Sequence, residues 1–269
     1  MSKIVHKITT NSPRKTIYTD LMQVCEQRGS GYFVLIDPDK KTEAETLQTV
    51  SHCAEAGVDA ILIGSSLMLS SRFGSTIQAI KKEFSLPVII FPGSTIQLSE
   101  YADALLFLSL ISSRNPEFLI TTQVLGAPIV RKMGLEAIST GYMLIESGKV
   151  TSAEFMSNSK PIPRDKNDIA VAHALAGEYL GMKTIYLEAG SGALHSVPAE
   201  MVSAVSEYVN IPVIVGGGIR TPEDALQKVE AGASFVVTGN VLEHSGSLSL
   251  IREFANAIHW KTPAAQKHA

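Results

Sequence analysis

The chain has few cysteines, no block of like charge and no long apolar run. Across 269 residues, 23 Lys and Arg stand against 26 Asp and Glu, which gives a net charge of −3. Binding to a phosphate backbone needs clustered Lys and Arg, so this balance argues against a nucleic-acid partner. The longest apolar run, around residues 104–108, is far shorter than the roughly 20 residues of a membrane-spanning helix. Residues 1–11 lack the apolar segment of a secretory signal.

Only two cysteines are present, Cys25 and Cys53, and both fall in segments with helical spacing. They do not predict a disulfide framework, and they favour a reducing, cytoplasmic compartment. Apolar residues make up 45% of the chain and charged residues 18%, which suits a large buried core. No linker divides the sequence. We therefore expect a single domain over residues 1–269, with flexible ends at about 1–12 and 263–269.

Short apolar or β-branched runs alternate with longer segments of helical spacing. This alternation is typical of parallel strands joined by crossover helices. Several runs are apolar throughout, as expected for a sheet covered on both faces or closed into a barrel. Eight such runs predict an α/β fold, a (β/α)8 TIM barrel. The runs are residues 32–36, 60–63, 88–91, 104–108, 134–145, 184–187, 213–215 and 235–237.

Capping sequences mark the starts of three intervening helices. Thr221 precedes Pro222 and two acidic residues, which is a typical helix start. Thr42 precedes a first turn with two glutamates, and a glycine closes that segment. The segment that begins at Ser196 repeats the pattern before residues 201–208. Three similar starts make accidental periodicity an unconvincing explanation.

Two regions depart from a regular barrel. Residues 92–103 are too few for a full helix and two loops, so we expect the third helix to be missing or replaced by extended chain. The fifth unit is long and contains a turn signal at Ser147 and Gly148 within a hairpin-like pattern. We expect a β-extension there that leads into the polar loop at residues 157–168.

Glycines follow the last three predicted strands, at the carboxyl ends where barrel sites lie. They occur in residues 188–192, in residues 216–218, and at Gly239 beside Asn240. Glycine lets backbone N–H groups turn toward an anion and lets the chain approach a ligand closely. The pattern predicts a phosphate site. The alternative is that residues 216–218 only form a tight turn into the helix after Thr221.

Asp37 and Ser66 follow the first two predicted strands. A carboxylate at a barrel mouth suits Mg²⁺, which needs one or two protein oxygens besides the phosphates of its substrate. The serine hydroxyl would add a further oxygen. Alternatively, Asp37 accepts backbone N–H groups in its own turn and Ser66 caps the next helix. Spacing leaves both interpretations of Asp37 and Ser66 open. For Asp39 we expect a role in the turn itself, and Lys40 is either a phosphate partner or solvated.

Glu188 differs from an ordinary surface acid. Alternation along residues 184–188 puts Glu188 on the same strand face as Tyr186, and this face points into the barrel if the other face meets the helices. Burial there would raise the pKa of the carboxyl and suit it to proton abstraction. The alternative is an ion pair with Arg220 or Lys132.

We assign no chemistry to two histidines and the single tryptophan. His173 lies in a helical stretch and favours helix packing. His195 follows a glycine loop, but no second histidine stands at metal-ligand spacing. Trp260 predicts an anchor for the last helix against the barrel base.

The combination of these segments resembles the geranylgeranylglyceryl phosphate synthase family, which includes heptaprenylglyceryl phosphate synthases. The resemblance covers nearly the whole chain. The short connection after Phe91 also resembles that family, whose barrel lacks the third helix. The segments are residues 35–40 (LIDPDK), 63–66 (IGSS), 87–93 (PVIIFPG), 186–192 (YLEAGSG), 216–219 (GGGI) and 239–240 (GN).

The resemblance implies a Mg²⁺-dependent prenyltransferase of ether-lipid biosynthesis. Such an enzyme joins geranylgeranyl or another prenyl diphosphate to the 3-hydroxyl of sn-glycerol 1-phosphate and releases diphosphate. It implies that Asp37 and Ser66 contact the metal, with Ser66 standing where many members have threonine, and that Glu188 receives the hydroxyl proton. The residues it implies for glycerol phosphate are Tyr186, Leu187, Glu188, Ala189, Gly190, Ser191, Gly192, Gly217, Gly218, Gly239 and Asn240.

Three further expectations concern the tail and the partners. A prenyl tail needs an apolar trench, for which the candidates are Phe107, Leu108, Phe118, Tyr142 and Met143. The family usually assembles as dimers or larger rings, so the resemblance implies a homo-oligomer. A lipid-like product implies transient contact with a membrane surface. Two other functions stay open: another phosphate-binding barrel enzyme, such as a sugar-phosphate isomerase or an indole-type synthase, and a non-catalytic barrel that binds a phosphorylated metabolite or a protein.

Overall fold

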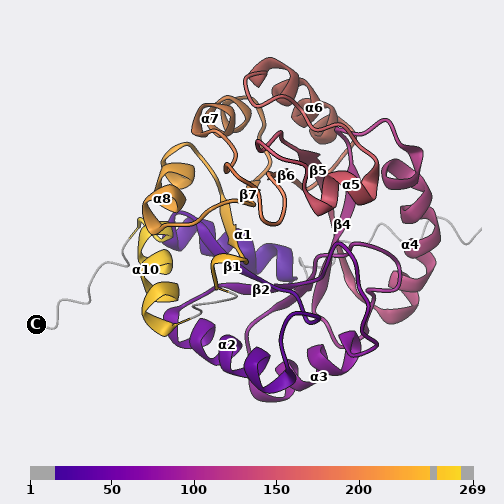
Figure 1. Cartoon of the computed structure of the whole chain (residues 1–269), viewed down its shortest axis with the longest axis vertical. Helices are drawn as coiled ribbons and strands as arrows, with labels where there is room; N and C mark the ends of the chain where they lie inside the picture. Colours follow the sequence, from indigo (N-terminus) through magenta and orange to yellow (C-terminus); the bar gives the residue numbers. More distant parts are fainter. Residues whose placement is uncertain (1–15, 243–246, 262–269) are drawn as a thin grey trace, which may run out of the picture.

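A computed structural model describes residues 16–242 and 247–261 of the chain. Eight parallel strands pair in chain order and close into one barrel (Figure 1). Each of the eight predicted runs is a strand, so the TIM barrel is confirmed. The strands are β1 (Gly31–Ile36), β2 (Ala60–Ile63), β3 (Val88–Ile90), β4 (Ala104–Leu110), β5 (Glu136–Leu144), β6 (Thr184–Glu188), β7 (Val213–Gly216) and β8 (Phe235–Thr238).

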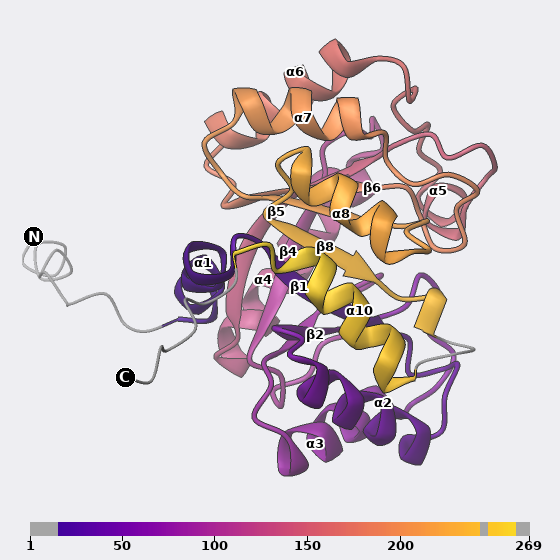
Figure 2. The same cartoon turned by 90° about the vertical axis from the view of Figure 1, so that its left-hand side faces the viewer.

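Helices surround the barrel, and α1 (Ile17–Arg28) lies across one end of it (Figures 1 and 2). A π-helical turn, η2 (Glu117–Thr121), leads directly into α4. The other helices are α2 (Glu43–Ala56), α3 (Phe73–Glu83), α4 (Thr122–Met133), α5 (Ser152–Ser157), α6 (Asn167–Tyr179), α7 (Ala199–Tyr208), α8 (Pro222–Glu230) and α10 (Leu248–Ile258).

The two irregular connections differ in outcome. Residues 91–103 run from β3 to β4 through turns and bends, with no helix in this described segment. The hairpin expected after β5 is wrong. Thr151 accepts a hydrogen bond from the Glu154 N–H and starts α5, so the chain winds into a helix where a second hairpin strand would lie. The only bridge there is parallel, between Ile145 and Ile162.

Two of the three predicted helix starts are confirmed. Thr42 forms a reciprocal capping box with Glu45, and the Thr221 side chain accepts from the Asp224 N–H. The third helix, α7, is present, but the predicted cap is wrong, because the helix begins after Pro198 without a side-chain cap. The Ser196 hydroxyl instead donates to the Asp224 carboxylate at 3.1 Å. The Ser196 hydroxyl, which was expected to cap α7, thus binds to the first turn of α8 instead.

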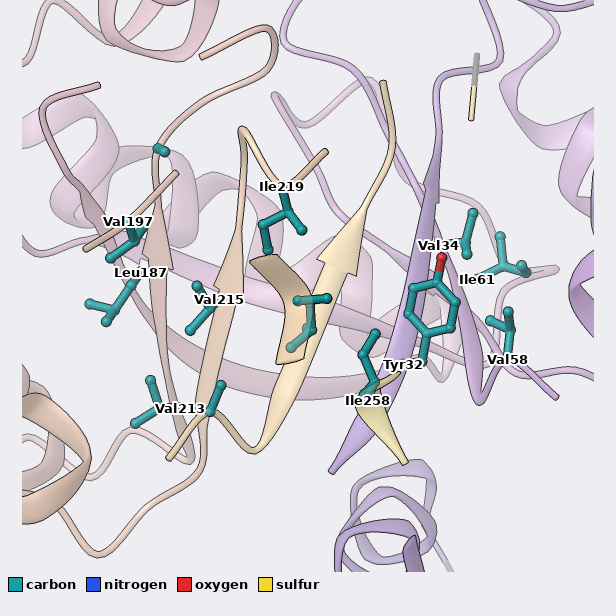
Figure 3. Packing of buried hydrophobic residues seen from close by; sticks show 14 of the residues in the cluster. Tyr32, Val34, Val58, Ile61, Leu187, Val197, Val213, Val215, Ile219 and Ile258 are labelled. Atoms are coloured by element: carbon teal, nitrogen blue, oxygen red, sulfur yellow. The ribbon is translucent and has the colours of Figure 1, made fainter. Parts of the chain in front are cut away.

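Alternation along the strands produces two apolar layers. One layer fills the barrel interior, where the Phe33 and Phe235 rings stack at 4.6 Å and Leu21 of α1 closes the end. The other layer lies between strands and helices, and Figure 3 shows Leu187 and Val215 in it. This division decides which strand residues can reach a ligand, because only inward-facing side chains at the open end border the interior.

Some expectations fall at the margins of the described chain. The predicted flexible ends, 1–12 and 263–269, lie outside the described residues. Cys25 and Cys53 are both free, in α1 and α2.

Trp260 follows α10 and lies against Gly29, at the end of α1. Of the helices that the structure describes, none combines the length and apolar character needed to cross a membrane.

Candidate active site

A cavity of about 750 Å³ opens where the strands end. It brings together most residues expected to form the site, from loops after β1, β2, β6, β7 and β8. Leu187, Ala189 and Gly190 do not line it, and the first two pack in the outer apolar layer. The expected residues that line it are Asp37, Ser66, Tyr186, Glu188, Ser191, Gly192, Gly217, Gly218, Gly239 and Asn240.

Glu188 points inward at the end of β6, on the same face as Tyr186, and is only 5% exposed. Burial raises the pKa of its carboxyl to about 7, although the Gly190 N–H, which donates to Oε1 at 2.6 Å, opposes the shift. Among the described residues the carboxylate has no ion pair with Arg220, whose guanidinium donates to the carbonyls of Ala193 and Leu194. Glu188 can therefore exchange a proton near neutral pH.

Three aromatic rings pack beneath the cavity. Tyr186 stacks on Phe91 at 5.2 Å and meets Tyr142 edge-on at 5.5 Å. Burial and the nearby charge of Glu188 raise the pKa of both tyrosines. The Tyr186 hydroxyl is buried close enough to Glu188 for each group to shift the pKa of the other, and it has no further hydrogen-bond partner within the described part of the chain. A buried hydroxyl at a cavity wall with Glu188 as its polar neighbour has capacity for a further hydrogen bond, so this group is suited to a ligand.

Glycine is required in the loop after β7. Gly217 has φ of +80°, and a Cβ there would collide with Glu188 and with the Gly190 backbone. Gly218 has φ of +72°, and a Cβ there would approach the backbone of Ser196. The positive φ angles and close approaches leave backbone beside the cavity with no side chain over it, which suits an anion.

Asp37 is held by its own loop and by its neighbour. The Asp39 N–H donates to Oδ1 at 3.0 Å, and the Ser65 hydroxyl donates to Oδ2 at 3.0 Å. The turn role considered for Asp37 is therefore present, and the residue still lines the cavity. Ser66 does not cap α3, whose N-cap is Arg72. Asp39 has the expected loop role, since it accepts the N–H groups of residues 69 and 70.

Three lining residues that were not among the predicted site residues contact other parts of the site. Ser65 positions Asp37 through its hydroxyl. In the sequence it cannot be distinguished from Ser66, because both are serines that directly follow β2. Gln123 of α4 donates from Nε2 to the carbonyls of Leu108 and Phe118, and its Oε1 is buried without a partner among the described residues. Arg220 had been considered only as a partner for Glu188. No local pattern distinguishes Gln123, because its neighbours come from β4 and η2.

The cavity has an apolar side opposite the glycine loops. Phe107, Leu108, Phe118 and Tyr142 of the expected trench line it. Met143 does not, because it faces outward and is buried between barrel and helices. Next to these side chains, the lining includes Leu98 from the helix-free connection between β3 and β4. The cavity thus joins a polar end to an apolar one.

Neither histidine considered in the sequence lines the cavity. The His173 ring lies on α6, where its Nδ1 is 2.7 Å from the Ile169 carbonyl. His195 is exposed and lies against Gly148. No cluster of three or more His, Cys, Asp or Glu side chains able to hold a metal occurs within residues 16–242 and 247–261.

Comparison with known proteins identifies the family. The model of the PcrB family matches residues 22–258, which is most of the chain. The chain belongs to the PcrB family. The resemblance seen in the sequence is therefore confirmed, because relatives in this family carry the name geranylgeranylglyceryl phosphate synthase.

Two such relatives come from distant organisms. The Chitinophaga pinensis protein is 48% identical over 232 residues, covering 86% of this chain and 91% of its own. The Methanosphaera stadtmanae protein is 46% identical over 229 residues, covering 85% and 93% respectively.

Solved structures of the same enzyme support the fold of this PcrB-family chain. The (S)-3-O-geranylgeranylglyceryl phosphate synthase of Thermoplasma acidophilum, in complex with its substrate sn-glycerol-1-phosphate, has a TM-score of 0.87 at 35% identity. The alignment covers 91% of this chain and 99% of that one. The Thermoplasma volcanium enzyme has a TM-score of 0.86 at 34% identity, with coverage of 91% and 98%.

Proposed function

We propose that the chain is a prenyltransferase that alkylates the 3-hydroxyl of sn-glycerol 1-phosphate with geranylgeranyl diphosphate, releasing diphosphate and forming 3-O-geranylgeranylglyceryl 1-phosphate. The observation that carries this function is one cavity with a buried base, a glycine-lined anion end and an apolar end. Relatives that share nearly half of its residues are named for this activity.

Glu188 is the proposed general base. Its pKa near 7 lets the carboxylate accept the proton of the attacking hydroxyl as the ether bond forms. The Gly190 N–H holds the carboxylate in place, and the Tyr186 hydroxyl lies beside it at the same cavity. Together these groups would orient the glycerol hydroxyl toward the allylic carbon. Holding two reactants in this geometry lowers the activation free energy, because little orientational entropy is then lost in the reaction step.

The glycine loops after β6, β7 and β8 are the proposed phosphate site. Gly217 and Gly218 leave backbone open to the cavity, and the Ser191 hydroxyl donates to the Asn240 side chain at 2.9 Å across two loops. An anchored phosphate holds the hydroxyl at a constant distance from Glu188. Leu187, Ala189 and Gly190 were also predicted for this site. Their side chains do not line the cavity, so in this proposal they would only shape the backbone of the loop.

Asp37 and Ser66 are the proposed Mg²⁺ ligands. The donor set fits this ion, because the Asp37 carboxylate lines the cavity and accepts its hydrogen bonds from two neutral donors, the Asp39 N–H and the Ser65 hydroxyl. Mg²⁺ commonly takes one or two protein oxygens and completes its shell with substrate phosphates and water. When bound, the ion would neutralise the departing diphosphate. Ser65 then acts as a positioning residue for Asp37.

The apolar wall receives the prenyl tail in this proposal. Phe107, Leu108 and Phe118 offer apolar surface, and the rings of Phe91 and Tyr142 lie where tail and glycerol ends meet. Aromatic faces attract positive charge, so they favour the charge that develops as the allylic bond breaks. The proposal also includes a homo-oligomer, transient contact with a membrane surface and a cytoplasmic location, the last supported by two free cysteines.

The decisive experiment supplies labelled sn-glycerol 1-phosphate, Mg²⁺ and prenyl diphosphates of graded length. We expect a labelled lipid product, with geranylgeranyl diphosphate as the preferred donor. E188Q should retain glycerol phosphate binding and lose turnover by about a hundredfold or more. Absence of product with every donor would contradict the prenyltransferase, and an isomerase or a non-catalytic barrel would then be favoured.

A further inference from the structure

Exposed apolar side chains lie beside the mouth of the cavity. Leu69, in the β2–α3 loop, is 82% exposed, and Phe155, on α5, is 77% exposed. They and four others follow the carboxyl ends of β2, β3 and β5, at the end of the barrel opposite α1 (Figure 2). We call this set the rim patch: Leu67, Leu69, Ile96, Val150, Phe155 and Met156.

The rim patch continues the apolar wall of the cavity outward. Leu67, Leu69 and Met156 line the cavity and are also about half to four-fifths exposed. Behind them the wall proceeds inward to Phe107 and Phe118. Single exposed apolar residues are ordinary, whereas a group around a ligand opening marks an interaction surface. The opening therefore presents an apolar path from the protein surface to the interior.

Basic side chains stand among the apolar ones. The Arg72 guanidinium donates only to the Ser70 hydroxyl and a backbone carbonyl, so no carboxylate neutralises its charge. Lys149 approaches Gly192 at the cavity lining, and Lys160 is exposed. None of these three cations forms an ion pair with another residue that the structure describes. The surface around the mouth thus combines apolar side chains with basic side chains that form no ion pair within the described chain.

We propose that the rim patch docks on the surface of an anionic lipid bilayer, from which the prenyl diphosphate enters the cavity. This inference rests on the proposed function, because a prenyl diphosphate is an amphiphile that resides in membranes. Apolar side chains at an interface enter the boundary between head groups and acyl chains, and nearby Lys and Arg attract anionic head groups. Docking at the mouth would spare the tail a passage through water.

Two triple variants separate the rim from the rest of the surface. In I96Q/V150Q/F155Q, the three residues are 65–77% exposed and do not line the cavity. The matched control, Y179Q/L180Q/Y208Q, removes three apolar side chains that are 61–81% exposed near the opposite end of the barrel. Because all six side chains are exposed, both variants should fold, and thermal melting would verify it.

Sedimentation with phosphatidylglycerol and phosphatidylcholine vesicles provides the binding measurement. We expect the unmodified chain and the control to bind phosphatidylglycerol vesicles, more weakly at high salt and more weakly to phosphatidylcholine. The rim variant should lose about tenfold in vesicle partitioning. Failure of the unmodified chain to bind, as expected if the patch receives a protein partner, would overturn the proposal, as would equal losses in both variants.

Measurements of turnover distinguish a failure of the docking proposal from a failure of the proposed function. With a short, water-soluble prenyl diphosphate and no vesicles, all three proteins should react at equal rates. With geranylgeranyl diphosphate held in vesicles, the rim variant alone should slow severalfold, and an unchanged rate would count against docking. Vesicle binding through the rim without turnover on any donor would contradict the prenyltransferase while supporting the docking surface.

Discussion

At the residue scale, Glu188 links chemistry to stability. Its pKa is raised from 4.5 to about 7, so the folded state binds the proton more tightly than the unfolded state. Folding stability therefore falls as pH rises from about 4.5 to about 7, by up to about 3 kcal/mol. The hydrogen bond from the Gly190 N–H offsets part of the cost of burying the charged carboxylate.

This linkage predicts opposite pH trends for activity and stability. Turnover should rise as pH increases through about 7, because only the ionised carboxylate accepts a proton. E188Q should be more stable than the unmodified chain at pH 8 and similar to it at pH 4, as measured by denaturant unfolding. A turnover that is flat between pH 6 and 8 would argue against Glu188 as the base.

Asp37 predicts a separate effect on magnesium. Replacing it in D37N removes the charge and retains one oxygen, which can still accept from the Asp39 N–H while the new amide NH2 faces the Ser65 hydroxyl. The Mg²⁺ concentration needed for half-maximal turnover should rise about tenfold or more, with glycerol phosphate binding unchanged.

D39N serves as the control for this variant, since the Asp39 carboxylate accepts N–H groups of its neighbouring loop. It should leave the magnesium requirement within about twofold. Equal shifts in D37N and D39N would mean that the loop, and not the Asp37 ligand, sets the requirement.

At the element scale, the turn after β7 joins the phosphate site to the base. In G217A a Cβ would meet Glu188 and Gly190, and the positive φ adds about 1–2 kcal/mol of backbone strain. We expect KM for glycerol phosphate to rise and kcat to fall, each by about tenfold, in steady-state kinetics.

The matched control is G134A at the end of α4. Gly134 also has a positive φ, of +74°, but a Cβ there would meet nothing within 4 Å. Unfolding measurements should show the backbone strain alone in G134A and a larger loss of stability in G217A, where the collisions add to it, while only G217A loses activity. If G134A also lost activity, the loss in G217A would be explained by lower stability and not by the position of Gly217 beside Glu188.

At the scale of the whole molecule, the outer face of α4 predicts self-association. Val124 and Leu125 are 62% and 61% exposed on this helix, with Ile120 and Ile129 beside them. An apolar strip on the barrel wall is typical of an interface between copies. Light scattering should give a dimer or a larger assembly, and V124E/L125E should dissociate it. A stable monomer of the unmodified chain would contradict this prediction.

The sequence by itself determined the strands and their facing. Period-two alternation is a local property, so residues 184–188 already placed Tyr186 and Glu188 together on one face. Thr42 and Thr221 likewise begin their helices through hydrogen bonds that span three residues. Features of this kind depend on neighbours in the chain, and reading along the chain was sufficient to find them.

Only the tertiary structure decided how the site is assembled. Ser65 and Ser66 are adjacent and chemically identical, yet only the Ser65 hydroxyl contacts Asp37 from another strand. Ser196 bonds to Asp224 on a different helix, and Gln123 meets carbonyls of β4 and η2. The pKa of Glu188 is raised by burial, which depends on the surrounding strands and loops. Hydrogen bonds and burial across the barrel join distant parts of the chain, and no local pattern encodes those distances.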